Sequence, residues 1–449
     1  MTSRHPPGPP GWPFAALRAY RRDPLGFVSR CMQDYGGLVH LRMAHRHVYL
    51  LSDPAAIEQV LVRQAARYRK GITNVHMRHV VGQGLIAADG DLWRRQRRLM
   101  QPFFDKRSLG AHVPAMALEA EAAVERLLAL GDEPVDLYEA GAEIALRVIA
   151  SCLLGVDAQP LLDSLRGNVA VVMDWVLGQA TALVPSPLWW PSGRNRTFKR
   201  AMASLDRFVA ELIAAPRSAA PDAPPTLLEA LLAARGDPDD PVMDDRQVRD
   251  ELLSNVLAGH ESTACTLAWV LYELARRPEV RARLREEVSQ VAGEGRLTAE
   301  HVPQLDYTRR VMSEAMRINP PTWAFTRDCL EPAEIGDYAI PRRAIMIVCQ
   351  YTTHRNPAVW EDPERFDPDR FLPERVSARP KFAFIPFGGG KHQCIGGDFA
   401  LVELTLTIAE IMRRLELTLV DESRVIHEPA LALVPKHGVW VRVSPREGS

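Results

Sequence analysis

The sequence predicts a mainly α-helical protein with small peripheral β-sheets, which is an α+β fold class. From about Pro54 to about residue 300, apolar residues recur at helical spacing, interrupted only by short polar or proline-containing joints. The clearest helix is predicted from Asp244 to Arg277, between Pro241 and Pro278. At about 1.5 Å per residue this helix would be roughly 50 Å long, which is enough to cross a whole domain.

Short runs of β-branched and other apolar residues predict the strands. These runs are Leu38–Met43, His47–Leu51, Ala344–Cys349 and Val439–Val443. They are few and far apart in the chain, so we expect small sheets at the periphery. Prolines and aspartates crowd the stretch from Asn356 to Pro380, which predicts an ordered loop with little repeating hydrogen bonding.

We expect residues 1–449 to form a single domain. The length alone leaves the number of domains open. However, the proline- and alanine-rich joints are short for domain boundaries, and the sequence has no internal repeat. Four prolines and two glycines between positions 6 and 11 make residues 1–15 a stiff, non-helical lead-in, with a plain extended tail as the alternative.

Composition and charge exclude several classes of protein. Hydrophobic residues make up 47% of the chain and charged residues 25%, which is typical of globular proteins and not of disordered ones. A formal net charge of -1 gives no general attraction to nucleic acid or acidic membranes. The six cysteines are scattered without a C-x-x-C pair, and the sequence lacks an apolar run of signal-peptide or transmembrane type. We therefore expect a cytoplasmic protein without a transmembrane anchor.

A glycine-rich loop delivers Cys394 immediately before an apolar helix. The stretch from Phe384 to Ala400 reads FIPFGGGKHQCIGGDFA. Glycines let the backbone approach a flat cofactor closely, and N–H groups near a helix start stabilise negative charge on sulfur. A lone cysteine is more often a small buried hydrophobe. A phosphate-binding loop would need Ser or Thr after the lysine, whereas His392 follows Lys391.

This stretch resembles the haem-binding signature F-x-x-G-x-[RH]-x-C-x-G of the cytochrome P-450 family. The matching residues are Phe387, Gly390, His392, Cys394 and Gly396. The resemblance implies that all five lie at the cofactor site and that the Cys394 thiolate is the ligand to the iron of haem b, iron protoporphyrin IX. It also implies the family fold, with a long central helix over the haem.

Glu314 and Arg317 form a second match, the E-x-x-R motif of the same family. Residues three apart share a helix face and can pair, but most such pairs are weak surface contacts. Here the motif precedes the cysteine by about 80 residues and is followed by FDPDRF, which contains Arg370. The resemblance implies a structural triad of Glu314, Arg317 and Arg370 that holds the loop beneath the haem.

Trp93 and Arg97 provide a third match, the family's W-x-x-x-R motif. Their i, i+4 spacing places them on one helix face. The resemblance implies that Arg97 binds a haem propionate through a charge-assisted hydrogen bond and that the Trp93 indole offers a further donor. It implies the same propionate role for Arg327 and His392.

The fourth match is LAGHEST, from Leu257 to Thr263, which resembles the family's [AG]-G-x-[DE]-T. The resemblance implies that Gly259 leaves room for dioxygen and that Glu261 and the following hydroxyl relay protons as general acids. The sequence departs from the usual pattern, because Ser262 occupies the threonine position and Thr263 comes next. The relay hydroxyl therefore belongs either to Ser262, which lacks the methyl that restricts the threonine rotamer, or to Thr263.

The resemblance implies a haem-thiolate monooxygenase that inserts one oxygen atom of O2 into a C–H bond of a hydrophobic small molecule, such as a terpenoid, steroid or fatty acid. Hydroxylation is the expected reaction, with epoxidation or successive oxidation as alternatives. By family analogy four largely apolar segments face the substrate, with Trp175, Trp323 and Phe325 as walls. The segments are Gly71–Ala88, Val171–Val184, Leu253–Ala258 and Pro321–Phe325.

Electrons would come from separate proteins, because the chain contains no Gly-rich nucleotide fold for a flavin or nicotinamide. The expected donors are a ferredoxin or flavodoxin with its reductase, so NAD(P)H would act only indirectly. Arg94, Arg95, Arg98 and Lys391 are candidates for the docking surface, or simply solvated charges. A peroxide-driven or isomerising haem-thiolate enzyme and a non-enzymatic haem binder remain alternatives, and Glu261 with its neighbouring hydroxyl disfavours both.

Overall fold

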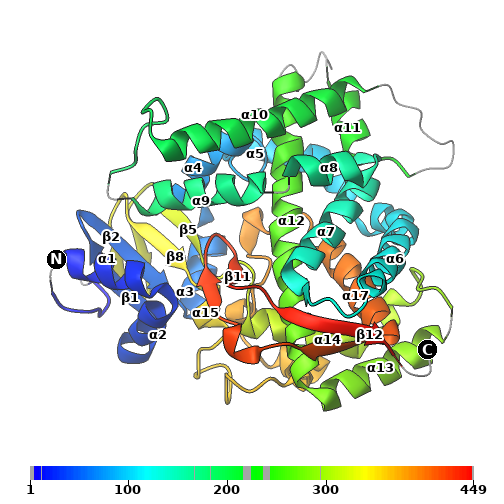
Figure 1. Cartoon of the computed structure of the whole chain (residues 1–449). Coiled ribbons are helices and arrows are strands. Elements are labelled where there is room, and N and C mark those ends of the chain that lie inside the picture. Colours follow the sequence, from blue (N-terminus) through cyan, green and yellow to red (C-terminus); the bar gives the residue numbers. More distant parts are fainter. Residues whose placement is uncertain are drawn as a thin grey trace. The chain divides into compact units, whose positions relative to one another are not determined.

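The structure is a computed structural model that describes residues 5–11, 13–165, 167–182, 184–215, 224–235, 243–293 and 295–446. Helices predominate and the strands form small separate sheets (Figure 1), so the predicted mainly α class with peripheral sheets is confirmed. Contacts divide the chain into two compact units. The first unit combines residues 1–75 with 310–394, and the second combines residues 76–309 with 395–449.

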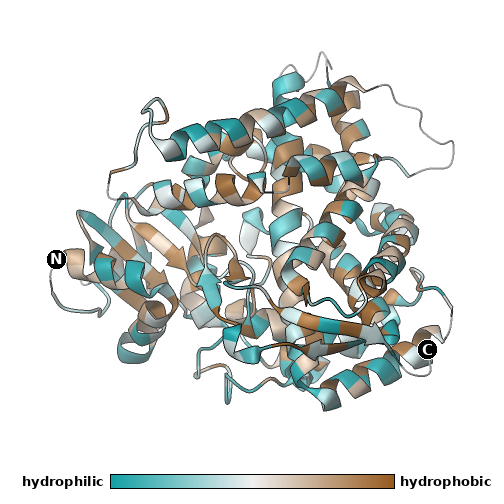
Figure 2. Cartoon of the chain, viewed as in Figure 1, coloured by the Kyte–Doolittle hydropathy of each residue, from teal (hydrophilic) through white to brown (hydrophobic). Residues whose placement is uncertain are grey.

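A five-stranded sheet forms the centre of the first unit. Its order is β1 (Leu38–Met43), β2 (Arg46–Leu51), β8 (Ile345–Val348), β5 (Phe325–Cys329) and β3 (Tyr68–Lys70). β2 and β8 pair in parallel, and the other neighbours are antiparallel. The predicted strands at 38–43, 47–51 and 344–349 are thus confirmed to within a residue at each end. β8 reads IMIV and is strongly hydrophobic (Figure 2), because it lies inside the sheet.

The lead-in lies along the edge of this sheet. Residues 5–11 are not helical, as predicted, but helix α1 begins at Pro13, so the prediction of a non-helical lead-in is wrong for residues 13–15. A proline suits the first position of a helix, because its missing N–H would have no partner there. The carbonyl of Pro7 accepts a hydrogen bond of 3.0 Å from the His40 amide in edge strand β1. A Cβ on Gly8 would lie 1.9 Å from the His40 carbonyl oxygen, so only glycine permits this approach. The described part of the lead-in is therefore docked, whereas residues 1–4 and 12 of the predicted segment lie outside the described residues.

Short helices and a second small sheet complete the first unit. The elements are α1 (Pro13–Arg22), α2 (Pro24–Tyr35), α3 (Pro54–Glu58), α4 (Ile72–Val81), β6 (Ala333–Ile335), β7 (Tyr338–Ile340), α14 (Asp306–Ile318), α15 (Gln350–Thr353) and α16 (Pro373–Ser377). Two of them, α4 and α14, continue into the second unit. The stretch 356–380 contains only a 3₁₀ turn and α16, as its prolines and aspartates predict.

The second unit is a helical bundle with two small sheets. Its helices are α5 (Gly90–Met100), α6 (Lys106–Ala129), α7 (Leu137–Val148), α8 (Ala158–Leu165), α9 (Asn168–Thr181), α10 (Gly193–Ala214), α11 (Leu227–Ala233), α12 (Asp245–Arg276), α13 (Pro278–Ala292) and α17 (Gly397–Arg414). Its strands are β4 (Val135–Asp136), β9 (Leu415–Leu419), β10 (His427–Pro429), β11 (Leu433–Pro435) and β12 (Trp440–Pro445). No helix in the described ranges is long and apolar enough to cross a membrane.

The long helix α12 passes through the second unit and packs against α7, α10 and α17 (Figure 1). It begins where the Asp244 side chain accepts a hydrogen bond from the Gln247 amide, and it ends before Pro278. The prediction of a helix over 244–277 is confirmed. Both ends of the helix lie in the core, because polar residues near its start and apolar residues in its second half are buried.

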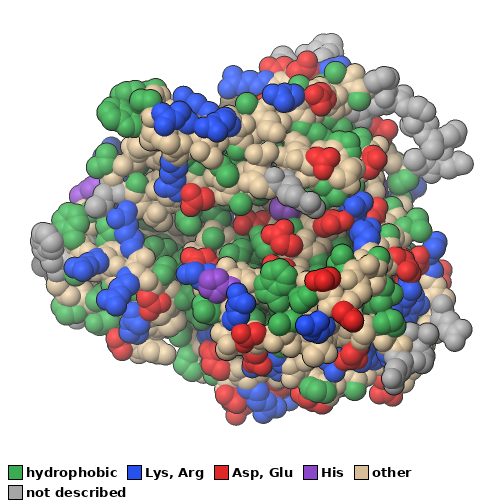
Figure 3. Space-filling view, viewed as in Figure 1, with side chains coloured by type: hydrophobic (Ala, Val, Ile, Leu, Met, Phe, Trp, Pro, Cys, Tyr) green, Lys and Arg blue, Asp and Glu red, His purple; other side chains and the backbone are tan. Residues whose placement is uncertain are grey.

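Basic and aromatic side chains meet at the surface where α10 begins. Trp189 and Trp190 are exposed and form an edge-to-face pair just before the helix. Arg194 and Arg196 follow in its first turn. In Figure 3, hydrophobic side chains stand beside a group of Lys and Arg side chains over this part of α10. The basic face of α10 is therefore flanked by two exposed indoles.

Candidate functional site

The loop that ends at Cys394 is closed and tightly packed within the first unit. The Cys394 amide donates to the carbonyl of Phe387 at 3.0 Å. Gly390 has φ +69°, and a Cβ there would lie 2.0 Å from the Leu61 carbonyl oxygen, so a side chain is excluded on two counts. Cys394 is exposed, whereas the other five cysteines are buried. The loop therefore presents this one sulfur to an approaching group.

Arg327 and His392 line the same small cavity of the first unit. Arg327 lies on β5 and is largely buried, and its Nη1 donates to the Thr326 carbonyl at 2.9 Å. Lys391 and Tyr68 line the cavity as well. Arginine, lysine and histidine side chains at one cavity suit a carboxylate, because each can donate a hydrogen bond to it. The sequence placed Arg327 and His392 65 residues apart, and the fold brings them together.

Glu314, Arg317 and Arg370 form a buried ionic network in the first unit. Arg317 donates to both carboxylate oxygens of Glu314, from Nε at 2.7 Å and from Nη2 at 2.9 Å. Arg370 Nε lies 3.4 Å from Glu314 Oε1. Although three hydrogen bonds and two cations favour its charged form, loss of hydration is the largest influence and raises the pKa of Glu314.

The same arginines hold the loop 354–365 through its backbone. Arg317 Nη1 donates to the carbonyls of His354 at 2.9 Å and Pro363 at 2.7 Å. Arg370 Nη2 donates to the carbonyl of Asp362 at 2.8 Å. This stretch has little secondary structure in which its carbonyl groups could find partners, so the guanidinium groups donate the hydrogen bonds that a helix or sheet would otherwise supply.

Trp93 and Arg97 lie on α5 in the second unit, on one face as their spacing predicts. The Trp93 side chain is buried and Arg97 is partly exposed. Arg97 Nε donates to Gln101 Oε1 at 2.8 Å. Arg94 and Arg98 are exposed on another face of the helix, and Arg94 forms an ion pair with Asp91. α5 thus presents one face with Trp93 and Arg97 and a second face that is basic and open to solvent.

The middle of α12 is less buried than either side of it. Ala258 is exposed and the next four residues are partly exposed, whereas both flanking stretches are buried. Ser262 lies on this open strip, and its Oγ donates to the Ala258 carbonyl at 2.7 Å. Thr263 is only 4% exposed. Of the two candidate hydroxyls, the structure therefore leaves that of Ser262 accessible and buries that of Thr263.

Two other side chains of this strip have lost hydration. Desolvation raises the pKa of Glu261 to about 7 and lowers the pKa of His260 to about 4. Glu261 is therefore close to half-protonated at neutral pH, which suits a group that gives and takes protons. His260 is neutral there, and its buried Nδ1 has no hydrogen-bond partner among the described residues.

The surroundings of Gly259 show a close packing contact. A Cβ on Gly259 would lie 3.2 Å from Cδ1 of Ile149, which begins the π-helical stretch Ile149–Leu154. The small residue is explained by close packing between α12 and this stretch. Nothing in these contacts concerns space for dioxygen, so that role stays a prediction.

Trp175 was expected at a substrate wall, and the structure places it in the core of the second unit. Its indole is almost fully buried, stacks on Phe198 at 4.1 Å between ring centroids and donates to Asn195 Oδ1 at 2.8 Å. Trp323 is also buried, in the first unit. Phe325 is partly buried against the core of the β-sheet. Leu183, within the predicted segment 171–184, lies outside the described residues.

Sequence reasoning missed three polar residues of α12 that hold the neighbouring loop. Asp250 accepts from the Gln83 amide at 2.8 Å, Glu251 from the Leu85 amide at 2.9 Å, and Ser254 Oγ from the Ile86 amide at 3.0 Å. All three side chains are buried. Two adjacent carboxylates directly before the apolar pair Leu252 and Leu253 are the signal that could have identified them, because buried charge needs a partner.

Comparison with known proteins covers almost the whole chain. The family model described as Cytochrome P-450 matches residues 6–441. Cyclooctatin synthase of Streptomyces melanosporofaciens is 33% identical over 432 residues, which are 96% of this chain and 94% of the relative. Cyclooctat-9-en-7-ol 5-monooxygenase of the same organism is 33% identical, covering 88% and 85%. Pentalenene oxygenase of Streptomyces avermitilis is 31% identical, covering 92% and 91%.

Proposed function

The chain belongs to the cytochrome P-450 family and is a monooxygenase of that family, and on this premise we propose that it oxidises a terpenoid with Cys394 as the iron ligand. The observation that carries the proposal is the exposure of Cys394. It is the one exposed cysteine among six, on a loop that its glycines allow to pack closely against Leu61. We also propose that residues 1–449 act as a single domain, although they pack as two compact units.

The residues fit haem b on each unit separately. On the first unit, Cys394 would ligate the iron, and Arg327 and His392, at their shared cavity, would hold propionate groups. On the second unit, Arg97 would bind a propionate and Trp93 would support it. When bound, the haem-thiolate group activates O2 for insertion into unactivated C–H bonds. Phe387, Gly390 and Gly396 belong to the loop and helix start that would approach the porphyrin.

The triad of Glu314, Arg317 and Arg370 has a structural function in this proposal. Its guanidinium groups bind carbonyls of the loop 354–365, which precedes the cysteine loop in the same unit. A firmly held loop limits the motion of Cys394, and a ligand must keep its position for catalysis.

For proton delivery we assign the relay hydroxyl to Ser262. It lies on the open strip of α12 and its hydroxyl is held by the Ala258 carbonyl, whereas Thr263 is buried. Glu261 would exchange protons with solvent, since its pKa of about 7 lets it hold or release a proton near neutrality. Thr263 then has a packing role in the helix.

The substrate is proposed to be a terpenoid, because similar proteins named for cyclooctat-9-en-7-ol and pentalenene are oxygenases. Hydroxylation is the expected reaction. On the second unit, the loop 83–86 is fastened to α12 by Asp250, Glu251 and Ser254. One oxygen of each side chain accepts from a loop amide, while the second oxygen of Asp250 accepts from Arg249 and that of Glu251 from Gln247. The apolar residues of the loop would contact a hydrophobic molecule.

We further propose that electrons come from a ferredoxin or flavodoxin with its reductase, which would draw on NAD(P)H. The exposed arginines Arg94 and Arg98 on α5 offer a basic surface to an acidic donor. Arg95, which is partly exposed, and the exposed Lys391 of the first unit are further candidates for contact.

The proposal is tested with purified haem-loaded protein and a panel of terpenoids, steroids and fatty acids. We expect a terpenoid to shift the haem absorbance, and to be converted to a hydroxylated product with label from isotopic O2 when reduced ferredoxin is supplied. Turnover with peroxide but not with reduced ferredoxin would overturn the assignment of O2 and a redox partner. Ligand binding without oxygen consumption would indicate a haem sensor instead.

A further inference from the structure

Four polar aromatic or basic side chains share one face of the β1–β2 hairpin. The antiparallel register pairs His40 with Tyr49 and Arg42 with His47. Directly paired residues lie on the same face, and so do residues two apart on one strand. His40 and His47 are therefore diagonal neighbours, and His40 Nε2 lies 2.9 Å from His47 Nδ1.

The lead-in adds a third imidazole to this face. The hydrogen bond from the His40 amide to the Pro7 carbonyl and the close approach of Gly8 fix the segment along β1. His5 then reaches over the hairpin, where its Nδ1 lies 2.8 Å from the Tyr49 hydroxyl. A residue 35 positions before His40 is thus held beside it by backbone contacts that do not involve its own side chain.

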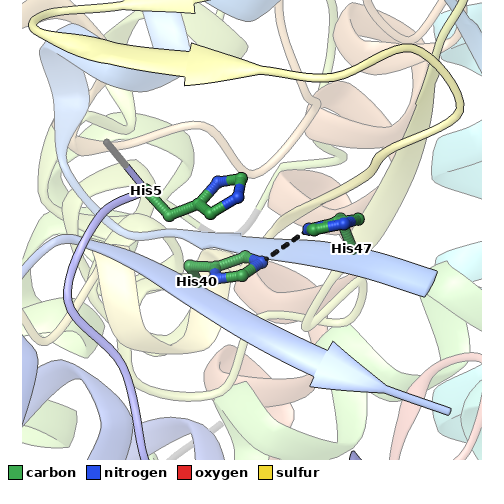
Figure 4. A group of neighbouring side chains, drawn as sticks. All are labelled: His5, His40 and His47. Carbon is green, nitrogen blue, oxygen red and sulfur yellow. Dashed lines mark hydrogen bonds between the residues drawn. The ribbon is translucent and has the colours of Figure 1, made fainter. Parts of the chain in front are cut away.

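The three imidazole rings lie together, as Figure 4 shows. The ring centroids of His5 and His40 are 4.3 Å apart, those of His5 and His47 are 5.0 Å apart, and those of His40 and His47 are 5.1 Å apart. One nitrogen from each ring can be chosen so that all three lie within 4.8 Å of one another. Each residue is partly buried, so the cluster is reachable from solvent.

The donor set suits a transition metal. Zinc binds imidazole nitrogen at about 2.0–2.1 Å, which for tetrahedral geometry requires nitrogens about 3.4 Å apart. Because the ring planes are only 17–34° apart, the side chains must rotate out of this stack for three in-plane lone pairs to meet at one ion with that spacing. Imidazole binds a metal ion in its neutral form, through either ring nitrogen.

We propose that His5, His40 and His47 bind one divalent late first-row transition-metal ion, with zinc as the reference case and water in the fourth position. Three imidazoles without a carboxylate favour zinc, nickel or copper over magnesium or calcium, which prefer oxygen ligands. The ion fastens the lead-in to the hairpin. This site is independent of the proposed monooxygenase chemistry.

Arg42 provides a check on the electrostatics of the site. Its Nη1 lies 3.3 Å from His47 Nε2, so its charge is close to the ion. A cation opposes a second cation at this range. Arg42→Gln should therefore bind zinc several-fold more tightly than the wild type. If the three rings form only an aromatic stack, this substitution should not change the zinc affinity of the protein.

The test is a calorimetric titration of the haem-loaded full chain with Zn²⁺ after treatment with a chelator. We expect one equivalent to bind in the micromolar range or below. His5→Ala, His40→Gln and His47→Gln should each weaken this binding at least tenfold. His45→Gln is the matched control, because His45 is exposed in the turn of the same hairpin and does not belong to the cluster. The zinc affinity of His45→Gln should match that of the wild type.

Hydrogen exchange gives a second measurement, in which each protein is compared with itself in the presence and absence of zinc. Zinc should slow exchange of the His40 amide, the donor to Pro7, at least tenfold in the wild type and not at all in His5→Ala. The proposal is overturned if zinc affinity is unchanged in all three histidine variants, or falls equally in His45→Gln. Unchanged exchange of the His40 amide at saturating zinc would also overturn it.

Discussion

Replacing Arg317 with alanine should be the most destabilising of the simple changes considered for this protein. The side chains of Arg317 and Glu314 are both 0% exposed, and two hydrogen bonds join them. The substitution leaves the buried Glu314 carboxylate with the Arg370 guanidinium and a single hydrogen bond from the Asp367 amide, and it removes the donor from three loop carbonyls. Breaking one partner of such a pair costs about 3–5 kcal/mol of unfolding free energy.

Arg309 offers a matched control on the same helix. Asp306 and Arg309 have the same i, i+3 spacing on α14 as Glu314 and Arg317, but their side chains are 54% and 45% exposed. An exposed pair contributes less than about 1 kcal/mol. Arg309→Ala should therefore lower the unfolding free energy by no more than that amount. The difference between the two variants isolates the effect of burial.

The assay is denaturant unfolding of the haem-loaded protein, followed by circular dichroism and by the haem absorbance. Arg317→Ala should unfold at a much lower denaturant concentration and lose its haem more readily, because the loop before Cys394 loosens. Arg317→Lys should be nearly as damaging, since an ammonium group cannot reproduce the two-pronged contact. A loss of under about 1 kcal/mol for Arg317→Ala, equal to that of Arg309→Ala, would refute the reasoning about this network.

Three further predictions concern the helix α12 and the redox partner. Burial raises the pKa of Glu261 to about 7, so between about pH 4.5 and pH 7 the folded protein keeps a proton that the unfolded chain has released, and the unfolding free energy falls as the pH rises through this range. Glu261→Gln should remove this fall, which amounts to at most about 3 kcal/mol, in measurements of unfolding free energy against pH. Ser262→Ala should lower the ratio of product formed to oxygen consumed at least about tenfold, whereas Thr263→Val should leave this ratio near the wild-type value. If Thr263→Val lowers the ratio and Ser262→Ala does not, the relay hydroxyl belongs to Thr263. Replacing Arg94 and Arg98 together with alanine should raise the KM for reduced ferredoxin several-fold at low salt, with the difference vanishing at high salt; an unchanged KM and salt dependence would exclude this surface as the docking site.

Local signals explain the parts of the structure that the sequence predicts well. Helix α12 carries a capping aspartate at Asp244 and a stopping proline at Pro278, so both ends could be located within a residue. The spacing of Glu314 and Arg317 predicts only that the two side chains can pair, and the family resemblance predicts their structural role. Arg370 joins them only through the fold, and the family motif was needed to find it.

Contacts between distant segments account for the rest. Trp175 lies on an apolar helix face, and such a face has the same pattern whether it borders a pocket or the core; its partners Asn195 and Phe198 come from another helix. The choice between Ser262 and Thr263 depends on which side of α12 is covered. His5 meets His40 only because Pro7 and Gly8 dock on an edge strand, and no spacing along the chain indicates that contact.

The proposed role of Cys394 as the thiolate ligand is tested most directly by the absorbance of the reduced carbon monoxide complex. The wild type should show the long-wavelength Soret band that is typical of thiolate ligation. Cys394→His should lose this band while the protein remains folded, and Cys349→Ala, at a buried cysteine of the first unit, should keep it. If the thiolate-type band persists in Cys394→His, another residue holds the iron and the account of this site is wrong.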